Sequence, residues 1–436
     1  MNVGFIHLGC SKNLVDTEMT IGLFQKQGYK IVNEPEKADI LVINTCGFIT
    51  SAKEEAIGTI LEMAEYKKKK CKYLIVMGCL VQRYQKELEK LIPEVDVWIA
   101  YQTYDTLWEQ IEAKIGKNEK EEKEKSLCFM DRVITTGENY TYLRIAEGCS
   151  NRCTYCAIPS IRGPFQSRTI EDILEEANAL VKKGYRELIV IAQDTTKYGI
   201  DIYGEPKLVE LLQKLEKIES LKWIRFLYAY PETITEDLIQ TVKNSKKICH
   251  YFDIPIQHIA DPVLKRMNRK SNGDSIRKLI QKLRREIPDV IIRTTVMVGF
   301  PGETNEDFEE LYQFVQEAKF DKLGAFSYSK EENTPAARLK EQIHPMTKKS
   351  RYNKIMQLQQ TMAKQNLENK IGNTYEVFIE NKTFDGKYYV GRSYMDVPDV
   401  DGFIYMPMIE KALENQFVMC KITGVQGYDL IGEIIE

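Results

Sequence analysis

Three cysteines in the stretch EGCSNRCTYCAIP, residues 147–159, have the spacing of a metal-binding loop. Cys149, Cys153 and Cys156 form a Cys-x-x-x-Cys-x-x-Cys run. A structural zinc site takes four protein ligands, usually as two pairs, and no fourth cysteine or histidine lies nearby in the sequence. Thiolates are also the usual ligands of iron–sulfur clusters. Three of them can hold a 4Fe-4S cubane and leave its fourth iron open to a small molecule, and this is the interpretation that the spacing favours.

A second set of three cysteines is spread over the first eighty residues. Cys10, Cys46 and Cys79 each follow a short apolar run and each lies next to a glycine; the runs are NVGFIHLG, ADILVINT and YLIVMG. Such runs are typical of parallel strands, whose carboxyl ends meet at one edge of an open α/β sheet. A single free cysteine is often only a small buried residue. Three in the same structural position indicate a second iron–sulfur site with three protein ligands.

The elements that position the second set belong to an expected N-terminal domain, residues 1–116. Apolar runs alternate there with helical patterns such as SAKEEAIGTILEMAEY, whose Ser51-x-x-Glu54 start is typical of a capping box. This alternation predicts an open parallel α/β sheet. Residues 117–134 are expected to form a charged linker, because GKNEKEEKEKS has no apolar period.

Residues 135–368 repeat the strand–helix alternation six times. One expected strand, TYLRIAEG, comes directly before Cys149, and one expected helix begins at Thr169 and ends near Gly184. Six units predict a partial (β/α)6 barrel with its chemistry at the carboxyl ends of the strands. Residues 369–436 lose the helical period, and their short strands are broken by Gly, Pro and Asp, which predicts a small all-β barrel.

The composition is that of a soluble protein with several domains. The 436 residues are 43% hydrophobic and 29% charged, and the net charge is −3. No basic stretch with an apolar core opens the chain, and no apolar run approaches the roughly 20 residues of a membrane helix. These features predict a cytoplasmic protein. Ten cysteines in that compartment indicate metal binding or free thiols rather than disulfides.

The loop of Cys149, Cys153 and Cys156, with Tyr155 before its last cysteine, resembles the signature of the radical S-adenosylmethionine (SAM) superfamily. The resemblance implies that SAM binds the open iron. It also implies that one electron from the cluster releases a 5′-deoxyadenosyl radical, which removes hydrogen from a carbon that no side-chain base could deprotonate. Tyr155 is accordingly expected among the residues that bind the cofactor.

With its N-terminal cysteines and C-terminal β-domain, the whole chain resembles the radical SAM methylthiotransferases. The resemblance implies two 4Fe-4S clusters, with Cys10, Cys46 and Cys79 as ligands of the first. That cluster would carry sulfide or polysulfide, and two SAM molecules would be used per turnover. The C-terminal domain would be of the TRAM type, with an OB-like barrel. An electron donor such as flavodoxin or ferredoxin is implied, and the sequence does not identify the sulfur carrier.

Four stretches resemble the branch of this family that modifies a ribosomal protein: GCSKNLVDTE, GCLVQRY, AQDTTKYG and DVPDVDG. That branch adds a methylthio group to the β-carbon of an aspartate in small-subunit ribosomal protein twelve. The charge of the C-terminal domain agrees with a ribosomal-protein substrate, since residues 371–436 have five Lys and Arg against eleven Asp and Glu, a net charge of −6. An acidic domain would repel tRNA and attract a basic ribosomal protein. Those acids could also be an ordinary solvated surface.

Two other functions remain open on the sequence. One is a tRNA adenosine methylthiotransferase of the same mechanism. The other is a non-catalytic metal-binding protein that docks on the ribosome, for which zinc would be expected and no SAM cleavage.

Three further residues are expected to contact the cofactor, and none beyond the cluster ligands is expected to be catalytic. By resemblance, the SAM amino group is received at Gln193 and Asp194, a polar pair that could equally cap a helix. Arg293 is a charge inside the apolar strand VIIRTTVMVGFPG. Because burying it unpaired would be costly, it is expected to have a carboxylate partner from SAM or from the protein. The other four cysteines, Cys71, Cys128, Cys249 and Cys420, are expected to be structural.

Overall fold

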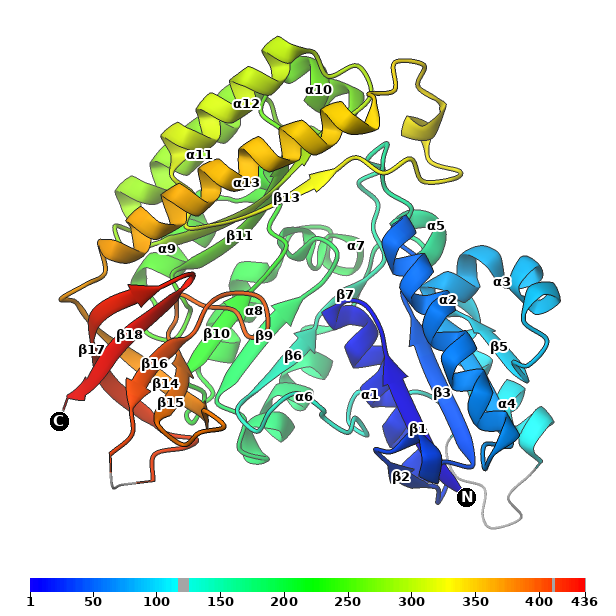
Figure 1. Ribbon diagram of the computed structural model, residues 1–436. Helices are drawn as coiled ribbons and strands as arrows, with labels where there is room; N and C mark the ends of the chain where they lie inside the picture. Colours follow the sequence, from blue (N-terminus) through cyan, green and yellow to red (C-terminus); the bar gives the residue numbers. More distant parts are fainter. Residues whose placement is uncertain (117–124, 410–411, 436) are drawn as a thin grey trace.

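A computed structural model describes residues 1–116, 125–409 and 412–435. An N-terminal α/β domain and a C-terminal β-barrel flank a central barrel of parallel strands (Figure 1). None of the described helices is long and apolar enough to cross a membrane.

The N-terminal domain is a five-stranded parallel sheet in the order β2-β1-β3-β4-β5. Its middle strand is buried along its whole length, and apolar clusters cover both faces of the sheet, as in a sheet enclosed by helices. The open α/β fold expected from the sequence is confirmed. The strands are β1 (Asn2–His7), β2 (Lys30–Val32), β3 (Ile40–Thr45), β4 (Tyr73–Gly78) and β5 (Val97–Ala100), and the helices are α1 (Ser11–Lys26), α2 (Thr50–Ala64), α3 (Cys79–Leu91) and α4 (Leu107–Ile115).

The start of α2 differs from the expected capping box. The helix begins at Thr50, so Ser51 and Glu54 lie inside it, and no side chain caps it locally. The backbone N–H of Thr50 donates instead to Glu331 of the central barrel, at 3.0 Å. The prediction was wrong because an acceptor remote in sequence satisfies the free N–H of the helix.

The central domain is the partial (β/α)6 barrel that the sequence predicts. Its six parallel strands form two sheets, ordered β10-β9-β6 and β11-β12-β13, which a single bridge between Ile224 and Ile248 joins. Thr169 caps α6 as expected, accepting from the backbone of Asp172 at 3.3 Å. The strands are β6 (Tyr140–Arg144), β9 (Glu187–Ile191), β10 (Trp223–Phe226), β11 (Tyr251–Gln257), β12 (Ile291–Val298) and β13 (Lys322–Ser327), with a short pair β7 (Ala146–Glu147) and β8 (Gln166–Ser167).

Helices cover the outside of this barrel (Figure 1). The longest, α13, crosses the outside of β13 and leads into the C-terminal domain. The helices are α5 (Ile158–Arg162), α6 (Ile170–Lys182), α7 (Ile200–Tyr203), α8 (Leu208–Glu216), α9 (Glu236–Asn244), α10 (Asp261–Arg266), α11 (Gly273–Glu286), α12 (Asn305–Ala318) and α13 (Pro345–Glu368).

The expected charged linker comprises residues 117–134, and its described part, residues 125–134, is only partly exposed. Residues 117–124 lie outside the described part of the chain. Near its other end, Arg132 is buried between α1 and α6, where it pairs with Glu18 at 2.9 Å and Glu176 at 2.6 Å. This end of the segment therefore packs between two domains, because its arginine meets acidic partners that lie far away in the sequence.

The C-terminal domain is a closed five-stranded barrel in the order β14-β15-β16-β18-β17. All its strand pairs are antiparallel except β16 with β18. The expected small all-β barrel is confirmed. Its strands are β14 (Thr374–Lys382), β15 (Tyr388–Arg392), β16 (Ile404–Pro407), β17 (Phe417–Gln426) and β18 (Asp429–Ile435).

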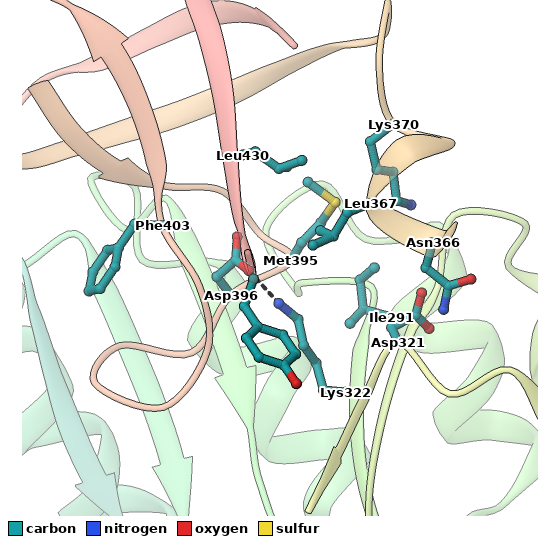
Figure 2. Close-up of a pocket in the computed structure, with 11 residues that line it drawn as sticks. Ile291, Asp321, Lys322, Asn366, Leu367, Lys370, Met395, Asp396, Phe403 and Leu430 are labelled. Carbon is teal, nitrogen blue, oxygen red and sulfur yellow. Dashed lines mark hydrogen bonds and ion pairs between the residues drawn. The ribbon is translucent and has the colours of Figure 1, made fainter. Parts of the chain in front are cut away.

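A small pocket marks the contact between the two barrels (Figure 2). It lies where β12 and β13 begin, at Ile291 and Lys322, and the Lys322 ammonium pairs there with Asp396 at 2.9 Å. This is the amino end of the barrel strands, whereas the cysteine loop follows a carboxyl end. The pocket therefore belongs to the packing of domains.

Acidic residues of the DVPDVDG stretch also contact the central barrel. Asp399 accepts a hydrogen bond from the Tyr140 hydroxyl at 2.6 Å, and Asp401 accepts one from Tyr251 at 2.7 Å. Together with Asp396, these carboxylates are used inside the molecule. The −6 balance of the C-terminal domain is therefore not wholly a surface charge, and it carries less weight in choosing a substrate than the sequence suggested.

Glu187 is expected to be the main electrostatic link between the two barrels. It is buried between two buried guanidinium groups, Arg225 at 2.9 Å and Arg392 of the C-terminal barrel at 2.9 Å. Burial raises the pKa of Glu187, but the two arginines lower it by more. Glu187→Ala should therefore lower the free energy of unfolding by about 3–5 kcal/mol, since it leaves the buried Arg225 without a carboxylate partner among the described residues and leaves Arg392 with Glu380 alone.

Trp223 offers the measurement, because its ring lies 4.9 Å from that of Phe417 across the same interface. Its fluorescence should report loss of docking at lower urea concentration in Glu187→Ala. Glu187→Gln, which keeps the acceptor oxygen, should lose less. An unchanged transition in Glu187→Ala would show that this link does not hold the barrels together.

Candidate functional site

The cysteines of the central barrel lie in the loop after β7. Cys149 and Cys153 are buried, Cys156 is half-buried, and all three are free thiols. The loop turns at Gly148, where φ is +68° and an added Cβ would lie 2.0 Å from the carbonyl oxygen of Pro164. Only glycine fits there without moving the backbone. The tight turn therefore directs the cysteine loop away from the end of the strand.

Two donors face the sulfurs of this loop. The backbone N–H of Ile158 donates to Cys156 Sγ at 3.4 Å, and the buried Arg269 lies with a guanidinium nitrogen 3.9 Å from Cys153 Sγ. Burial nevertheless raises the pKa of Cys156 to about 12 and also raises that of Cys149. The thiols of Cys149 and Cys156 therefore keep their protons at neutral pH, and a metal that binds them must displace those protons.

The N-terminal cysteines meet at one edge of the sheet, as the strand pattern predicts. They follow β1, β3 and β4, which are neighbours and parallel. The sulfurs of Cys10 and Cys79 both lie 3.7 Å from Asn13 Oδ1. Cys46 reaches the same place, since a Cβ added to Gly9 would come within 2.8 Å of its Cβ. Burial raises the pKa of Cys79 to about 12.

Across the described ranges, no three His, Cys, Asp or Glu side chains are close enough together to hold one metal ion. A cubane is larger than a single ion, and its thiolates stand further apart. The donor chemistry of both sets suits such a cluster: each supplies three free thiols, and amide or guanidinium donors face the sulfurs of the barrel set.

A buried arginine that the sequence did not single out joins the two sets of cysteines. Arg162 of α5 donates to Asn13 Oδ1 at 2.7 Å and to Asp16 of α1 at 2.9 Å. Its other nitrogen donates to Glu147, two residues before Cys149, at 2.6 Å. Burial raises the pKa of Glu147, but Arg162 and Arg144 lower it by more. The arginine thus fixes the N-terminal site against the barrel loop.

In the sequence, the charged residues of α1 were the feature that could have indicated this contact between the N-terminal domain and the barrel. Lys12, Asp16 and Glu18 are all buried although α1 is the first helix of a small domain. The buried carboxylates of Asp16 and Glu18 pair with arginines outside the N-terminal domain, as buried charges generally require. The sequence shows the charges but not their partners.

Asp194 holds the cysteine loop from the adjacent strand. It follows β9, is fully buried, and accepts hydrogen bonds from Asn151 at 2.8 Å and from Thr196 at 2.7 Å. Burial raises its pKa. The neighbouring Gln193 is half-buried and makes no hydrogen bond to any residue the structure describes. Of the expected pair, Gln193 therefore has the free polar group.

Tyr155 packs beside the cysteines rather than away from them. Its ring meets that of Phe300 edge to face, with centroids 6.4 Å apart, and burial raises its pKa. Phe300 belongs to the turn after β12. The aromatic residue of the motif therefore anchors the cysteine loop to the other sheet of the barrel.

Arg293 lies in β12 and is half-buried. Burial lowers its pKa, but Tyr251, Asp253 and Asp401 raise it by more. Even so, its guanidinium makes no ion pair within 4.0 Å in the part of the chain that the structure covers. The expected carboxylate partner is thus not supplied by a direct contact with any of the described residues.

A partial barrel with three free cysteines after its first strand defines a radical SAM enzyme. Residues 143–315 match the family model described as the Radical SAM superfamily. Residues 2–100 match Uncharacterized protein family UPF0004, and residues 371–435 match the TRAM domain.

Curated relatives match the chain over its whole length. The ribosomal protein uS12 methylthiotransferase RimO of Alkaliphilus oremlandii is 63% identical over 435 residues, 100% of this chain and 99% of the relative. That of Acetivibrio thermocellus is 48% identical, covering 99% of this chain and 98% of the relative. The chain therefore belongs to the RimO family of methylthiotransferases. This family consists of enzymes, which confirms the expected transferase over a non-catalytic metal-binding protein.

A solved structure shares the fold at low identity. It is that of a radical S-adenosylmethionine methyltransferase, TsrM, from Kitasatospora setae, with cobalamin and a 4Fe-4S cluster bound. The TM-score is 0.57 at 11% identity, covering 77% of this chain and 73% of that chain. The likeness concerns the fold alone.

Proposed function

We propose that this enzyme adds a methylthio group to the β-carbon of an aspartate in ribosomal protein uS12, the small-subunit ribosomal protein twelve. The observation that carries this proposal is the identity of 63% over the entire chain to a relative named for uS12. A tRNA adenosine methylthiotransferase of the same mechanism remains the second candidate from the sequence. The charge of the C-terminal domain no longer decides between them, because several of its acids contact the central barrel.

The barrel loop is proposed to hold a 4Fe-4S cluster through Cys149, Cys153 and Cys156. When bound, the cluster and SAM supply a 5′-deoxyadenosyl radical that removes hydrogen from the substrate carbon. The protein contributes placement: Gly148 sets the turn, Asp194 holds the loop through Asn151, and Tyr155 anchors it to β12. Gln193, whose amide is free among the described residues, is proposed to receive the SAM amino group.

The N-terminal edge is proposed to hold a second 4Fe-4S cluster through Cys10, Cys46 and Cys79. Its open iron would carry the sulfide or polysulfide to be methylated, with one SAM used as methyl donor and a second as radical source. An electron donor such as flavodoxin or ferredoxin would serve the barrel cluster. Support comes from the common edge of β1, β3 and β4 and from Arg162, which fixes this edge beside the barrel loop.

Incubation with uS12 and, separately, with deproteinised tRNA tests the substrate. With SAM and a reductant, one aspartate of uS12 should gain the mass of a methylthio group in place of one hydrogen, as mapped by mass spectrometry of its peptides. The tRNA nucleosides should stay unmodified. Modified tRNA beside unmodified uS12 would favour the second candidate.

A further inference from the structure

Two cations inside the central barrel, the buried Lys12 and the half-buried Arg293, make no ion pair with any acidic residue that the structure describes. Alternate residues of a strand face opposite sides of a sheet. In β12, Ile292 packs against the outer helices, whereas Ile291 packs inside, so Arg293 points inward as well. Lys12 comes from α1, which also packs against the inside cluster through Val15. We call Lys12 and Arg293 the lumen pair.

Asp253 and Tyr228 show that the lumen pair shares one space. Asp253 lies opposite Arg293 in the register of β11 and β12. Burial raises the pKa of Asp253, and the nearby Arg293 and Lys12 oppose that rise. The Lys12 ammonium sits 3.1 Å from the centre of the Tyr228 ring. Tyr228 has a φ of +64°, a strained conformation for a bulky residue that is often found at binding sites.

The donors of the lumen pair are unfilled. Lys12 is only 4% exposed. Within residues 1–116, 125–409 and 412–435, neither cation makes a hydrogen bond or an ion pair within 4.0 Å. Asp401, also near Arg293, already accepts from Tyr251 and from the backbone of Val397. A buried and a half-buried cation, both with N–H groups free among the described residues, are a setting in which a carboxylate from outside the protein binds strongly.

One side chain on the inward side of β13 is exposed to solvent. Phe326 pairs in register with Met297, which lies on the inward face of β12, and yet 52% of Phe326 is exposed. A substrate loop is proposed to approach the lumen pair from this side. Arg269 lies at Cys153 of the barrel set, whereas Lys12 lies two residues from Cys10 of the N-terminal set.

We infer that the lumen pair binds the carboxylate of the target aspartate, an inference that rests on the proposed function. The β-carbon of aspartate is bonded directly to its carboxylate carbon, so holding that group fixes the carbon to be modified. The same contact selects the substrate, because an adenosine has no carboxylate. SAM also has a carboxylate, and the test must separate the two.

The test is a comparison of uS12 with a uS12 variant in which the modified aspartate is Asn. Equilibrium binding to the reconstituted enzyme should favour the aspartate form by about tenfold. Lys12→Met and Arg293→Met should each bring the ratio of the affinities for the Asp and Asn forms close to one. Arg293→Lys should keep part of the preference for the Asp form. Lys322→Met is the matched control, since Lys322 is already paired with Asp396. Iron content and melting temperature verify that each variant is folded.

Binding of SAM to the same proteins separates the two carboxylates. The inference requires SAM affinity to stay within about twofold of wild type in folded Lys12→Met or Arg293→Met. Weaker SAM binding with an unchanged Asp-to-Asn ratio would assign the pair to SAM and overturn the inference. An unchanged Asp-to-Asn binding ratio in both variants, with uS12 still modified by the wild-type enzyme, would also overturn the inference. If wild type does not modify uS12 at all, the proposed function fails and this inference fails with it.

Discussion

Replacing Cys149, Cys153 and Cys156 together by alanine is expected to abolish the cleavage of SAM to 5′-deoxyadenosine. The rate with dithionite should fall by about a thousandfold or more, because these thiols are the proposed ligands of the cluster that supplies the electron. Chromatographic measurement of 5′-deoxyadenosine under anaerobic conditions tests this. Methylthiolation of uS12 should be lost to the same extent.

A buried cysteine elsewhere in the same domain provides the control. Cys249 lies in the apolar cluster inside the barrel, away from the loop, and is expected to be structural. Cys249→Ala should keep SAM cleavage within a few-fold of wild type, since it removes only a small buried group. Cleavage that survives in the triple variant would place the electron-donating cluster elsewhere.

Replacing Cys10, Cys46 and Cys79 together by alanine is expected to separate the two halves of the reaction. The barrel loop is intact in this variant, so SAM should still be cleaved to 5′-deoxyadenosine at a rate within about tenfold of wild type. The methylthio product should fall below detection, because the proposed sulfur-carrying iron has lost its ligands. Both products can be measured in one reaction by mass spectrometry.

Arg162 connects the two sites through Asn13 and Glu147, so a change at the N-terminal site can also disturb the barrel loop. Melting temperature must therefore show that the N-terminal domain still docks. Cys71→Ala is the matched control, as Cys71 is buried in the same domain but belongs to the core on the other face of β3. A full yield of methylthio product from the triple variant would rule out a sulfur-carrying role for these cysteines.

The arrangement of strands could be predicted from the sequence because it depends on local patterns. The apolar runs before Cys10, Cys46 and Cys79 are the strands β1, β3 and β4, and their common edge follows from parallel pairing. The cap at Thr169 was likewise local. Both rest on spacing within a few residues, where hydrophobic period and capping chemistry are informative.

The contacts between domains could not be predicted, because they join residues far apart in the chain. The start of α2 depends on Glu331, Arg132 meets Glu18 and Glu176, and Arg162 meets Asp16. Counting charges along the sequence gave the acidic balance of the C-terminal domain but not its use against Tyr140 and Tyr251. For the same reason the sequence analysis identified Arg293 as a charge within an apolar strand but did not identify Lys12.

The central claim is that two separate iron–sulfur clusters are each held by three protein thiolates. Iron and sulfide per chain, measured after anaerobic purification and reconstitution, test it most directly. About eight irons are expected in wild type and about four in each of the two triple-alanine variants, the barrel set and the N-terminal set. A triple variant that keeps the full iron content, or a wild type that holds only one cluster, would contradict the account.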